Sequence, residues 1–327
     1  MKYRSLGKTG FKISEISLGT WQLGGKWGDP FSYETAEKIL NKAVDAGINF
    51  IDTADVYNEG KSEEAIGKFL KSRRERIYVA TKCGRQLNPH ISESYQPEVL
   101  RKFVEHSLRR MKVETLDLIQ LHCPPTQVYY RPEIFELFDR LKDEGKILHL
   151  GVSVEKVEEA LKAIEFPNVT TVQIIFNMFR HRPSELFFSQ AKKKNAGIIV
   201  RVPLASGLLS GTYTEKTTFS PGDHRNFNIN GAAFDKGETF SGVDYKTGLE
   251  AAEKLKNIFP QQALAAVALR WVLMFDEVSC VIPGASRPEQ VISNLKAAEL
   301  PELKQTEMME VTKLYEEKVK PLVHHLW

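Results

Sequence analysis

Short apolar runs alternate with amphipathic helical stretches along most of this 327-residue chain, and this alternation constrains the fold more than any other feature. The runs are rich in Val and Ile and lack strict polar alternation, as is typical of parallel strands buried on both faces. We expect strands at 16–18, 49–52, 77–81, 116–121, 147–152, 171–175, 197–202 and 278–282. Helices are expected at 33–46, 62–70, 97–111, 132–144, 155–164, 184–195, 262–275 and 288–297.

Eight strands, each followed by a helix, predict an α/β fold of the closed (β/α)8 or TIM barrel type. Several helix boundaries agree with this division. Ser32 can cap the first helix, and Pro97, Pro132 and Pro288 lie where a first helical position tolerates proline. The alternation alone also fits an open doubly wound sheet, because periodicity does not report whether a sheet closes.

Two segments lie outside the repeat. Residues 1–13 are read as a hairpin that turns at Lys8-Thr9-Gly10 and plugs the bottom of the barrel. Residues 208–245 are rich in Gly, Asn, Asp, Phe and Thr without a clear period, and a loop this long is usually functional or mobile. A further helix is expected at 247–258. No linker-like stretch divides the chain, so we expect residues 1–327 to form a single domain.

Composition narrows the function classes. The 45 Lys and Arg residues against 42 Asp and Glu leave a net charge of +3, which argues against a nucleic-acid-binding protein. Three cysteines form no disulfide framework and suit a reducing compartment. The start of the chain lacks the apolar core of a signal peptide, and no run of about 18 apolar residues predicts a membrane span. We therefore expect a cytoplasmic protein, monomeric by default, without nucleic-acid or membrane partners.

Polar side chains at the carboxyl ends of three neighbouring strands are the candidates for chemistry. Asp52, Lys82 and His122 end the second, third and fourth strands, and Tyr57 follows Asp52 in the loop. Each alone is more often a structural residue, but in a closed barrel these positions meet at one mouth. A nearby lysine favours the phenolate form of tyrosine, and a tyrosine so placed can protonate a developing alkoxide. That chemistry requires a hydride donor and hence a nicotinamide cofactor.

These four residues, in the contexts Phe50–Tyr57, Ala80–Lys82 and Leu121–His122, resemble the catalytic tetrad of the aldo-keto reductase superfamily. The resemblance continues at 4–10, 17–21 and 203–211, and it is close to the bacterial branch that includes general-stress and sugar-related reductases. It implies an NADPH-dependent oxidoreductase that reduces aldehydes and ketones. By resemblance, Tyr57 is the proton donor, Asp52 and Lys82 tune it, and His122 places the carbonyl.

The resemblance also implies a set of residues that bind NADP(H). Ser153 and Gln173 match positions that bind the nicotinamide carboxamide, and the loop after the seventh strand lies along the pyrophosphate. Ser286 and Arg287 would grip the 2′-phosphate at a helix N-terminus, with Gln290 and Asn294 reaching the adenine. The full set is Thr20, Trp21, Asp52, Ser153, Gln173, Arg201, Pro203, Leu204, Ser206, Gly207, Leu208, Gly284, Ser286, Arg287, Gln290 and Asn294. The alternative for Ser286 is a helix cap, with Arg287 solvated.

The sequence departs from the family pattern at two positions. Val154 follows Ser153 where relatives often have Asn, so one carboxamide contact is in doubt. Arg201 stands where many relatives stack an aromatic residue on the nicotinamide. Its charge would disfavour the cationic, oxidised ring unless a carboxylate neutralises it. Trp21 and Trp27 either wall the substrate pocket or pack in the core.

Further motifs exclude other sites. No Gly-x-Gly-x-x-Gly follows the first strand, and no His, Cys or Asp cluster has zinc spacing, so neither a Rossmann site nor a metal is expected. Cys83 and Cys123 are read as packing residues.

Two other functions stay open. One is an NADPH-binding regulatory subunit of the potassium-channel beta type, which would show little turnover. The other is a barrel enzyme that acts on sugar phosphates without redox chemistry. For the reductase, we expect the substrate to be a small carbonyl compound: an aldehyde, a ketone or an aldose.

Overall fold

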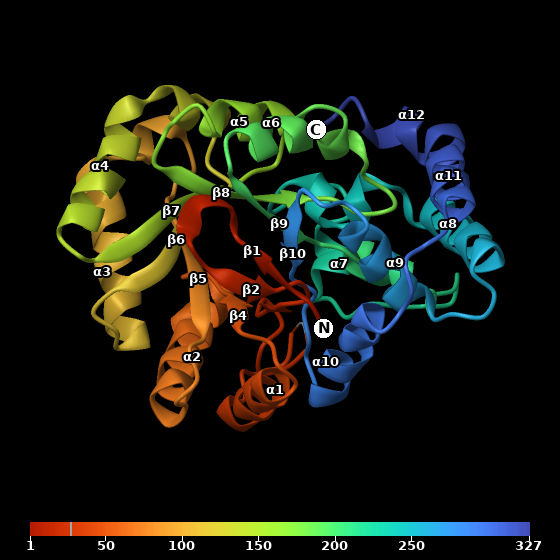
Figure 1. Ribbon diagram of the computed structural model, residues 1–327, viewed down its shortest axis with the longest axis horizontal. Coiled ribbons are helices and arrows are strands. Elements are labelled where there is room, and N and C mark those ends of the chain that lie inside the picture. Colours follow the sequence, from red (N-terminus) through yellow and green to blue (C-terminus); the bar gives the residue numbers. More distant parts are fainter. Residues whose placement is uncertain (27) are drawn as a thin grey trace.

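The computed structural model describes residues 1–26 and 28–327, and its centre is an eight-stranded parallel sheet. The strands follow one another around the sheet in chain order (Figure 1). They are β3 (Leu18–Gly19), β4 (Phe50–Asp52), β5 (Tyr78–Cys83), β6 (Leu116–His122), β7 (Ile147–Ser153), β8 (Val169–Ile175), β9 (Gly197–Arg201) and β10 (Val278–Val281). Every predicted strand overlaps one of these, with ends that differ by at most two residues.

The sheet closes into a barrel because its first and last strands meet. The Ser17 amide donates to the Val281 carbonyl over 2.9 Å, and the Gly19 amide donates to the Pro283 carbonyl over 3.1 Å. Parallel bridges join Ile16 to Val281 and Gly19 to Gly284 at the same seam. The predicted TIM barrel is confirmed, and the open doubly wound alternative is excluded.

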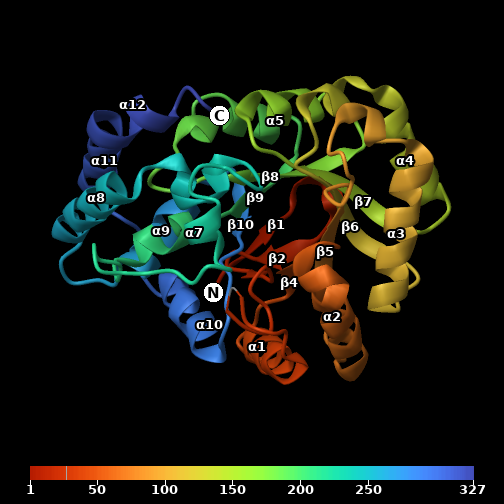
Figure 2. The same ribbon diagram turned by 180° about the vertical axis from the view of Figure 1, so that it is seen from behind.

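Helices surround the barrel on its outer face (Figures 1 and 2). They are α1 (Tyr33–Asp45), α2 (Lys61–Ser72), α3 (Pro97–Met111), α4 (Pro132–Asp143), α5 (Val157–Ala163), α6 (Phe187–Lys193), α8 (Tyr245–Ile258), α9 (Leu264–Leu273) and α10 (Pro288–Leu295). The Ser32 hydroxyl accepts from the Thr35 amide and caps α1 as predicted. In the part of the chain that the structure describes, no helix is long and apolar enough to cross a membrane.

The predicted helix 155–164 begins too early. The Glu159 carboxylate accepts hydrogen bonds from the Glu155 and Lys156 amides, both at 3.0 Å, so the helix starts at Val157. Glu155 therefore lies in the loop after β7, where its side chain turns toward the barrel mouth. The last helices, α11 (Gln305–Leu314) and α12 (Lys320–Val323), were not predicted from the sequence, and a π-helical turn at Tyr315–Val319 joins them.

The N-terminal hairpin plugs the bottom of the barrel, as expected. Its strands β1 (Tyr3–Ser5) and β2 (Lys12–Ser14) pair antiparallel, and the Arg4 guanidinium donates to the carbonyls of Leu273, Phe275 and Val278. Apolar side chains of the hairpin pack against inward-facing strand residues. This cluster comprises Leu6, Phe11, Ile13, Phe50, Ala80, Leu118, Ile199, Cys280 and Ile282.

The inward-facing side chains change from apolar at the bottom of the barrel to polar at its carboxyl end. Side chains two residues apart point to the same face of a strand, so those that follow Phe50 and Ala80 inside the barrel are Asp52 and Lys82. In β6 the same face carries Gln120 and then His122. The pleat therefore brings four polar side chains to the carboxyl end of the barrel, above the hairpin.

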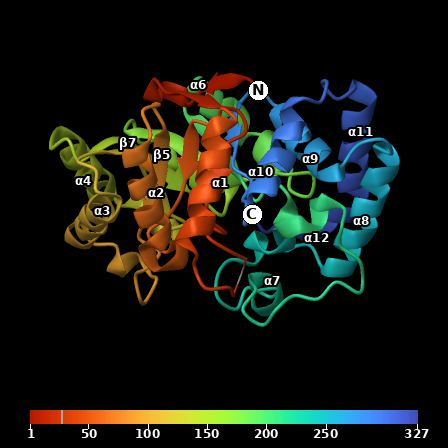
Figure 3. The ribbon, with the colours of Figure 1, turned by 90° about the horizontal axis from the view of Figure 1, so that it is seen from below.

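The segment 205–244 lies at that carboxyl end. Figure 3 shows its short helix α7 (His224–Phe227) and the N-terminal hairpin at opposite ends of the barrel. The segment also contains a 3₁₀ turn at Ala205–Ser210 and two more at Lys236–Glu238 and Phe240–Gly242. The predicted aperiodic loop is thus a set of short turns packed over the mouth.

Candidate active site

The structure brings Asp52, Tyr57 and Lys82 together at the barrel mouth. The Lys82 ammonium donates to Asp52 Oδ1 over 2.6 Å, to the Thr53 carbonyl over 2.8 Å and to the Tyr57 hydroxyl over 3.3 Å. The side chains of Lys82 and Asp52 are 1% and 3% exposed, so this is a buried ion pair. Lys82 is thereby directed at the phenol oxygen by two fixed acceptors.

Two glutamines hold the other oxygen of Asp52. Gln173 Nε2 donates to Asp52 Oδ2 over 2.7 Å, and Gln120 Nε2 donates to the same atom over 3.1 Å. Gln173 is one of the residues expected at the carboxamide; here its amide nitrogen faces Asp52. Gln120 was not among the predicted site residues, although its position two residues before His122 puts it on the same strand face.

Burial and neighbouring charges set the protonation of the phenol and the ammonium. Burial raises the pKa of Tyr57, and the nearby Lys82 only partly offsets this, so Tyr57 keeps its proton at neutral pH. For Lys82, burial acts to lower the pKa, but Asp52 and Tyr57 outweigh it and the pKa is raised. A protonated phenol held by a charged ammonium is chemically suited to donate a proton.

His122 lies beside Tyr57 and is neutral. The two ring centroids are 6.1 Å apart with the rings nearly perpendicular. Burial, together with the positive charges of Arg85, Lys82 and Arg201, holds the pKa of His122 well below its usual range. A neutral imidazole can donate a single hydrogen bond without adding a charge to the mouth.

Aromatic residues from two segments wall the site. The Trp21 and Tyr57 rings stack with centroids 6.2 Å apart, and Trp21 also lies 5.0 Å from His224 and 5.8 Å from Phe234. A cavity of about 150 Å³ adjoins Trp21 and Tyr57. Trp21 is thus placed beside the candidate site, whereas Trp27 lies outside the described residues.

The loop after β9 has an unusual backbone. Val202, Ala205, Ser206 and Gly207 all have positive φ, from 47° to 102°, a conformation that is costly for residues other than glycine. A Cβ on Gly207 would lie 2.2 Å from the Tyr213 hydroxyl. Such strain persists only where surrounding contacts enforce it, and it gathers in the segment expected along the pyrophosphate.

The predicted 2′-phosphate segment lies at the start of α10. Arg287 is exposed and precedes the first helical residue, while Gln290 Oε1 accepts from the amide and hydroxyl of Ser286 over 2.7 and 3.1 Å. Asn294 donates to the Gly284 carbonyl over 3.3 Å. The helix cap is therefore Arg287 rather than Ser286, and the Arg287 side chain is exposed at the start of α10.

Two further predicted residues contact protein atoms. The Thr20 hydroxyl donates to the Asp52 carbonyl over 2.8 Å, which fixes the backbone of the acid. The Ser153 hydroxyl lies 3.5 Å from the Cys123 sulfur. Cys83 and Cys123 are both buried, in agreement with their reading as packing residues.

Arg201 belongs to a group of four charged side chains that the sequence did not reveal; Arg201 and Glu238 are buried, and Arg85 and Glu155 are partly buried. Arg201 donates to Glu155 over 2.9 Å and to the Val154 carbonyl over 3.1 Å, and Arg85 donates to Glu238 over 2.9 Å. A longer contact of 3.7 Å joins Arg201 to Glu238. We call Arg85, Glu155, Arg201 and Glu238 the charge quartet. They come from four distant segments, so no spacing in the sequence relates them.

The two carboxyls of the charge quartet differ in the direction of their pKa shifts. Burial raises the pKa of Glu155, and Arg201 does not fully offset it. At Glu238, burial is outweighed by Arg85 and Arg201, which lower the pKa. Arg201 therefore lies against two carboxyl groups, at 2.9 Å and 3.7 Å, and is not an isolated charge.

The carboxylates of the charge quartet also lie near a thiol. Cys123, Glu155 and Glu238 place their ligand atoms within 4.8 Å of one another. Both carboxylates are engaged by guanidinium groups, and burial raises the pKa of the Cys123 thiol well above its usual range. We therefore interpret this cluster as an ion-pair group.

Asp55 is buried behind the tetrad, and neither of its carboxylate oxygens has a hydrogen-bond partner among the described residues. Burial, reinforced by Glu63, raises its pKa to about 7. The unfolded chain releases this proton near pH 4 and the folded chain near pH 7. The contribution of protonated Asp55 to the free energy of unfolding is therefore fully present below pH 4 and is lost as pH rises to 7.

We expect Asp55→Asn to remove this loss, because an amide does not ionise. Above pH 7 the variant should be more stable than wild type by roughly 1–4 kcal/mol, with little difference near pH 4. Urea unfolding at pH 4.5 and 8 measures the effect, and Asp139→Asn at an exposed position is the control. Equal pH dependence in wild type and Asp55→Asn would contradict the assignment.

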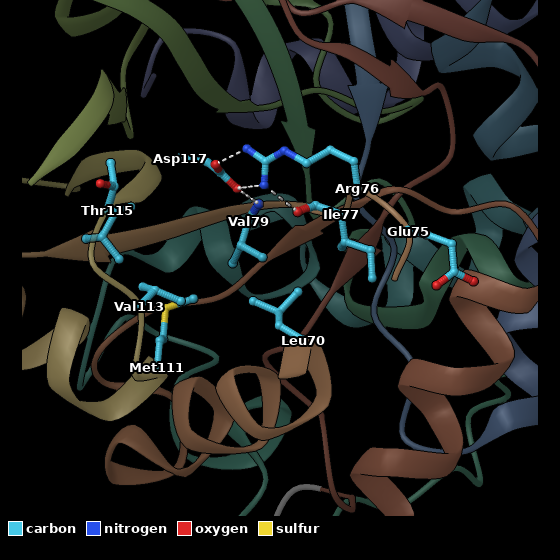
Figure 4. Close-up of a pocket in the computed structure, with 10 residues that line it drawn as sticks. Leu70, Glu75, Arg76, Ile77, Val79, Met111, Val113, Thr115 and Asp117 are labelled. Atoms are coloured by element: carbon cyan, nitrogen blue, oxygen red, sulfur yellow. Dashed lines mark hydrogen bonds and ion pairs between the residues drawn. The ribbon is translucent and has the colours of Figure 1, made fainter. Parts of the chain in front are cut away.

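A second cavity lies far from these groups. It encloses about 250 Å³ at the amino ends of β5 and β6, where Arg76 and Asp117 are paired at its rim (Figure 4). Leu70, Ile77 and Met111 form part of its apolar lining. It is on the opposite end of these strands from Lys82 and His122, so it is separate from the candidate site.

Comparisons with known proteins agree with this geometry. The model of the aldo/keto reductase family matches residues 15–316. The aldo-keto reductase YhdN of Bacillus subtilis is 31% identical over 298 residues, covering 89% of this chain and 87% of the relative. The NADH-specific methylglyoxal reductase of Escherichia coli is 30% identical over 320 residues, covering 91% and 93%. The holo form of an aldo-keto reductase from Bacillus halodurans superimposes with a TM-score of 0.74 at 28% identity, covering 96% of each chain. This chain therefore belongs to the aldo/keto reductase family, whose members are oxidoreductases that act on small carbonyl compounds.

Proposed function

We propose that this protein is an NADPH-dependent reductase of aldehydes and ketones, with Tyr57 as the proton donor. The observation that carries the proposal is the buried contact of Lys82 with both Asp52 and the Tyr57 hydroxyl. It leaves a protonated phenol at the barrel mouth, beside the neutral imidazole of His122. In this proposal His122 orients the carbonyl by a hydrogen bond, and Tyr57 delivers the proton to its oxygen as the alkoxide forms.

The residues present fit a nicotinamide dinucleotide. The loop 202–207 has the positive φ angles that a close approach of backbone to a ligand requires, and Arg287 is exposed at the start of α10. When bound, the cofactor supplies the hydride that the protein side chains lack. In our proposal, Pro203, Leu204, Ser206, Gly207 and Leu208 bind its pyrophosphate, and Ser286, Arg287, Gln290 and Asn294 bind its adenosine end. Thr20, Trp21, Asp52, Ser153, Gln173, Arg201 and Gly284 complete the predicted set.

The preference for NADPH over NADH rests on Arg287. A guanidinium forms charge-assisted hydrogen bonds with a phosphate, and only NADPH carries the 2′-phosphate. We expect Arg287→Ala to weaken NADPH binding by roughly 10- to 100-fold and to leave NADH binding within about twofold. Dissociation constants measured by fluorescence titration provide the test.

Lys296→Ala is the matched control for Arg287→Ala, because it removes an exposed positive charge from the other end of α10. An equal loss for both cofactors in Arg287→Ala would contradict a 2′-phosphate site. So would a wild-type preference for NADH, the cofactor named for the Escherichia coli relative.

Turnover separates the proposed enzyme from a regulatory subunit that binds NADPH. The reductase should oxidise NADPH steadily with simple aldehydes, ketones or aldoses, whereas the subunit should bind NADPH and stop after one equivalent. A barrel enzyme of non-redox chemistry should bind no nicotinamide. We further infer that residues 1–327 act as one domain and as a monomer, which light scattering of the purified chain can test.

A further inference from the structure

The two carboxylates of the charge quartet come from two separate segments at the barrel mouth. Glu155 lies in the loop after β7, and Glu238 ends the 3₁₀ turn Lys236–Glu238. Glu238 is also tied by its backbone, because its carbonyl accepts from the Ser206 hydroxyl over 2.9 Å. The position of this one turn therefore affects the charges around His122 and the loop after β9.

Arg180 contacts both the segment that carries Glu155 and the turn that carries Glu238. It is 3% exposed, and its Nη2 donates to the Glu155 carbonyl over 2.8 Å. Its Nη1 has no hydrogen-bond partner among the described residues, and burial lowers the pKa of Arg180 to about 9. A buried guanidinium with an incomplete set of acceptors depends on other contacts to stay in place.

Trp327, the last residue of the chain, provides that contact. The Arg180 guanidinium carbon lies 4.1 Å from the centre of the Trp327 ring, and the ring is buried at 5% exposure. A desolvated arginine over an indole face forms a favourable cation–π pair. Arg180 thus contacts both the Glu155 carbonyl and the Trp327 ring.

The same indole shapes the turn that carries Glu238. A Cβ added to Gly237 would lie 2.9 Å from the Trp327 ring and 2.2 Å from Arg180 Nη1, and one added to Gly242 would lie 2.3 Å from the ring. The backbone of 237–242 therefore packs directly on Trp327 at both of its ends, and only glycine allows this approach.

We propose that Trp327 is a positioning residue, which holds the two carboxylates of the charge quartet in place through Arg180 and the turn 237–242. The Trp327 ring contacts Arg180 and the backbone at Gly237 and Gly242. It acts on Glu155 through the guanidinium that holds its carbonyl, and on Glu238 through the backbone of its turn. The proposal rests on the proposed reductase function only for its kinetic consequence.

The first test is a double-mutant cycle in the full chain. Trp327→Ala should lower kcat/KM for an aldehyde by roughly tenfold, because the charge quartet loses its alignment beside His122. In a Glu238→Gln background the same substitution should cost less, about threefold, because only the route through Arg180 to Glu155 is left to disturb. Trp327→Phe should recover most of the activity, since it retains a ring over Arg180. Leu326→Ala, at a neighbouring side chain that is 39% exposed, should have no effect.

Equal losses in both backgrounds, or full activity in a folded Trp327→Ala variant, would overturn the proposal. Hydrogen exchange supplies a second readout that needs no turnover. The amides of 236–243 should exchange at least about tenfold faster in Trp327→Ala than in Leu326→Ala, while those of β4 and β5 keep their protection. Unchanged exchange at 236–243 would contradict the proposal, and absence of turnover in wild type would contradict only the proposed function.

Discussion

Tyr57→Phe is expected to lower the rate of carbonyl reduction by roughly 10²- to 10⁴-fold, the range that a positioned general acid contributes. The substitution removes one oxygen and keeps the ring, so the stacking with Trp21 at 6.2 Å is retained. Lys82 keeps its bonds to Asp52 and the Thr53 carbonyl. The measurement is single-turnover NADPH oxidation with a saturating aldehyde.

Cofactor binding is the control for Tyr57→Phe. The hydroxyl acts on the substrate oxygen in the transition state, so the dissociation constant of NADPH should stay within about twofold of wild type. Turnover close to wild type in this variant would reject Tyr57 as the donor. Loss of both turnover and cofactor binding would instead indicate a disturbed fold, which circular dichroism can detect.

Breaking the ion pair between Asp52 and Lys82 is expected to have the largest effect on stability. Both side chains are almost fully buried, and removal of one partner leaves an uncompensated charge in the barrel. Asp52→Asn and Lys82→Met should each lower the free energy of unfolding by roughly 3–5 kcal/mol. Each should also lower reduction at least about 10²-fold, because the ammonium no longer lies charged and fixed against Tyr57.

The double variant distinguishes a charge effect from a packing effect. With both charges removed, no unpaired ion remains, so the double variant should be more stable than the less stable of the two single variants. It should stay as inactive as they are. Guanidinium chloride unfolding measures the stabilities. Additive destabilisation in the double variant would mean that lost packing, and not an orphaned charge, accounts for the cost.

The family and the strand–helix repeat were predictable because both depend on local patterns, whereas closure of the sheet is not reported by periodicity. The strand at 116–121 and the helix at 97–111 can be read from runs of apolar residues and from Pro97, and the observed elements match them closely. The meeting of Asp52, Lys82 and His122 at one end of the barrel was predictable because each ends a recognisable strand. The start of α5 was misplaced because the capping contact of Glu159, and not the apolar pattern, decides it.

Local patterns in the chain were therefore sufficient to predict the eightfold repeat, the plugging hairpin and the acid, lysine, tyrosine and histidine at one end of the strands. The balance of their charges depends on contacts that form only in the folded barrel. Gln120 and Gln173 share one oxygen of Asp52, and Arg201 is paired with Glu155. Hydrophobic periodicity is a property of neighbouring residues, so it survives in the linear chain. Charge compensation joins residues far apart in the sequence, and it exists only after the barrel has closed.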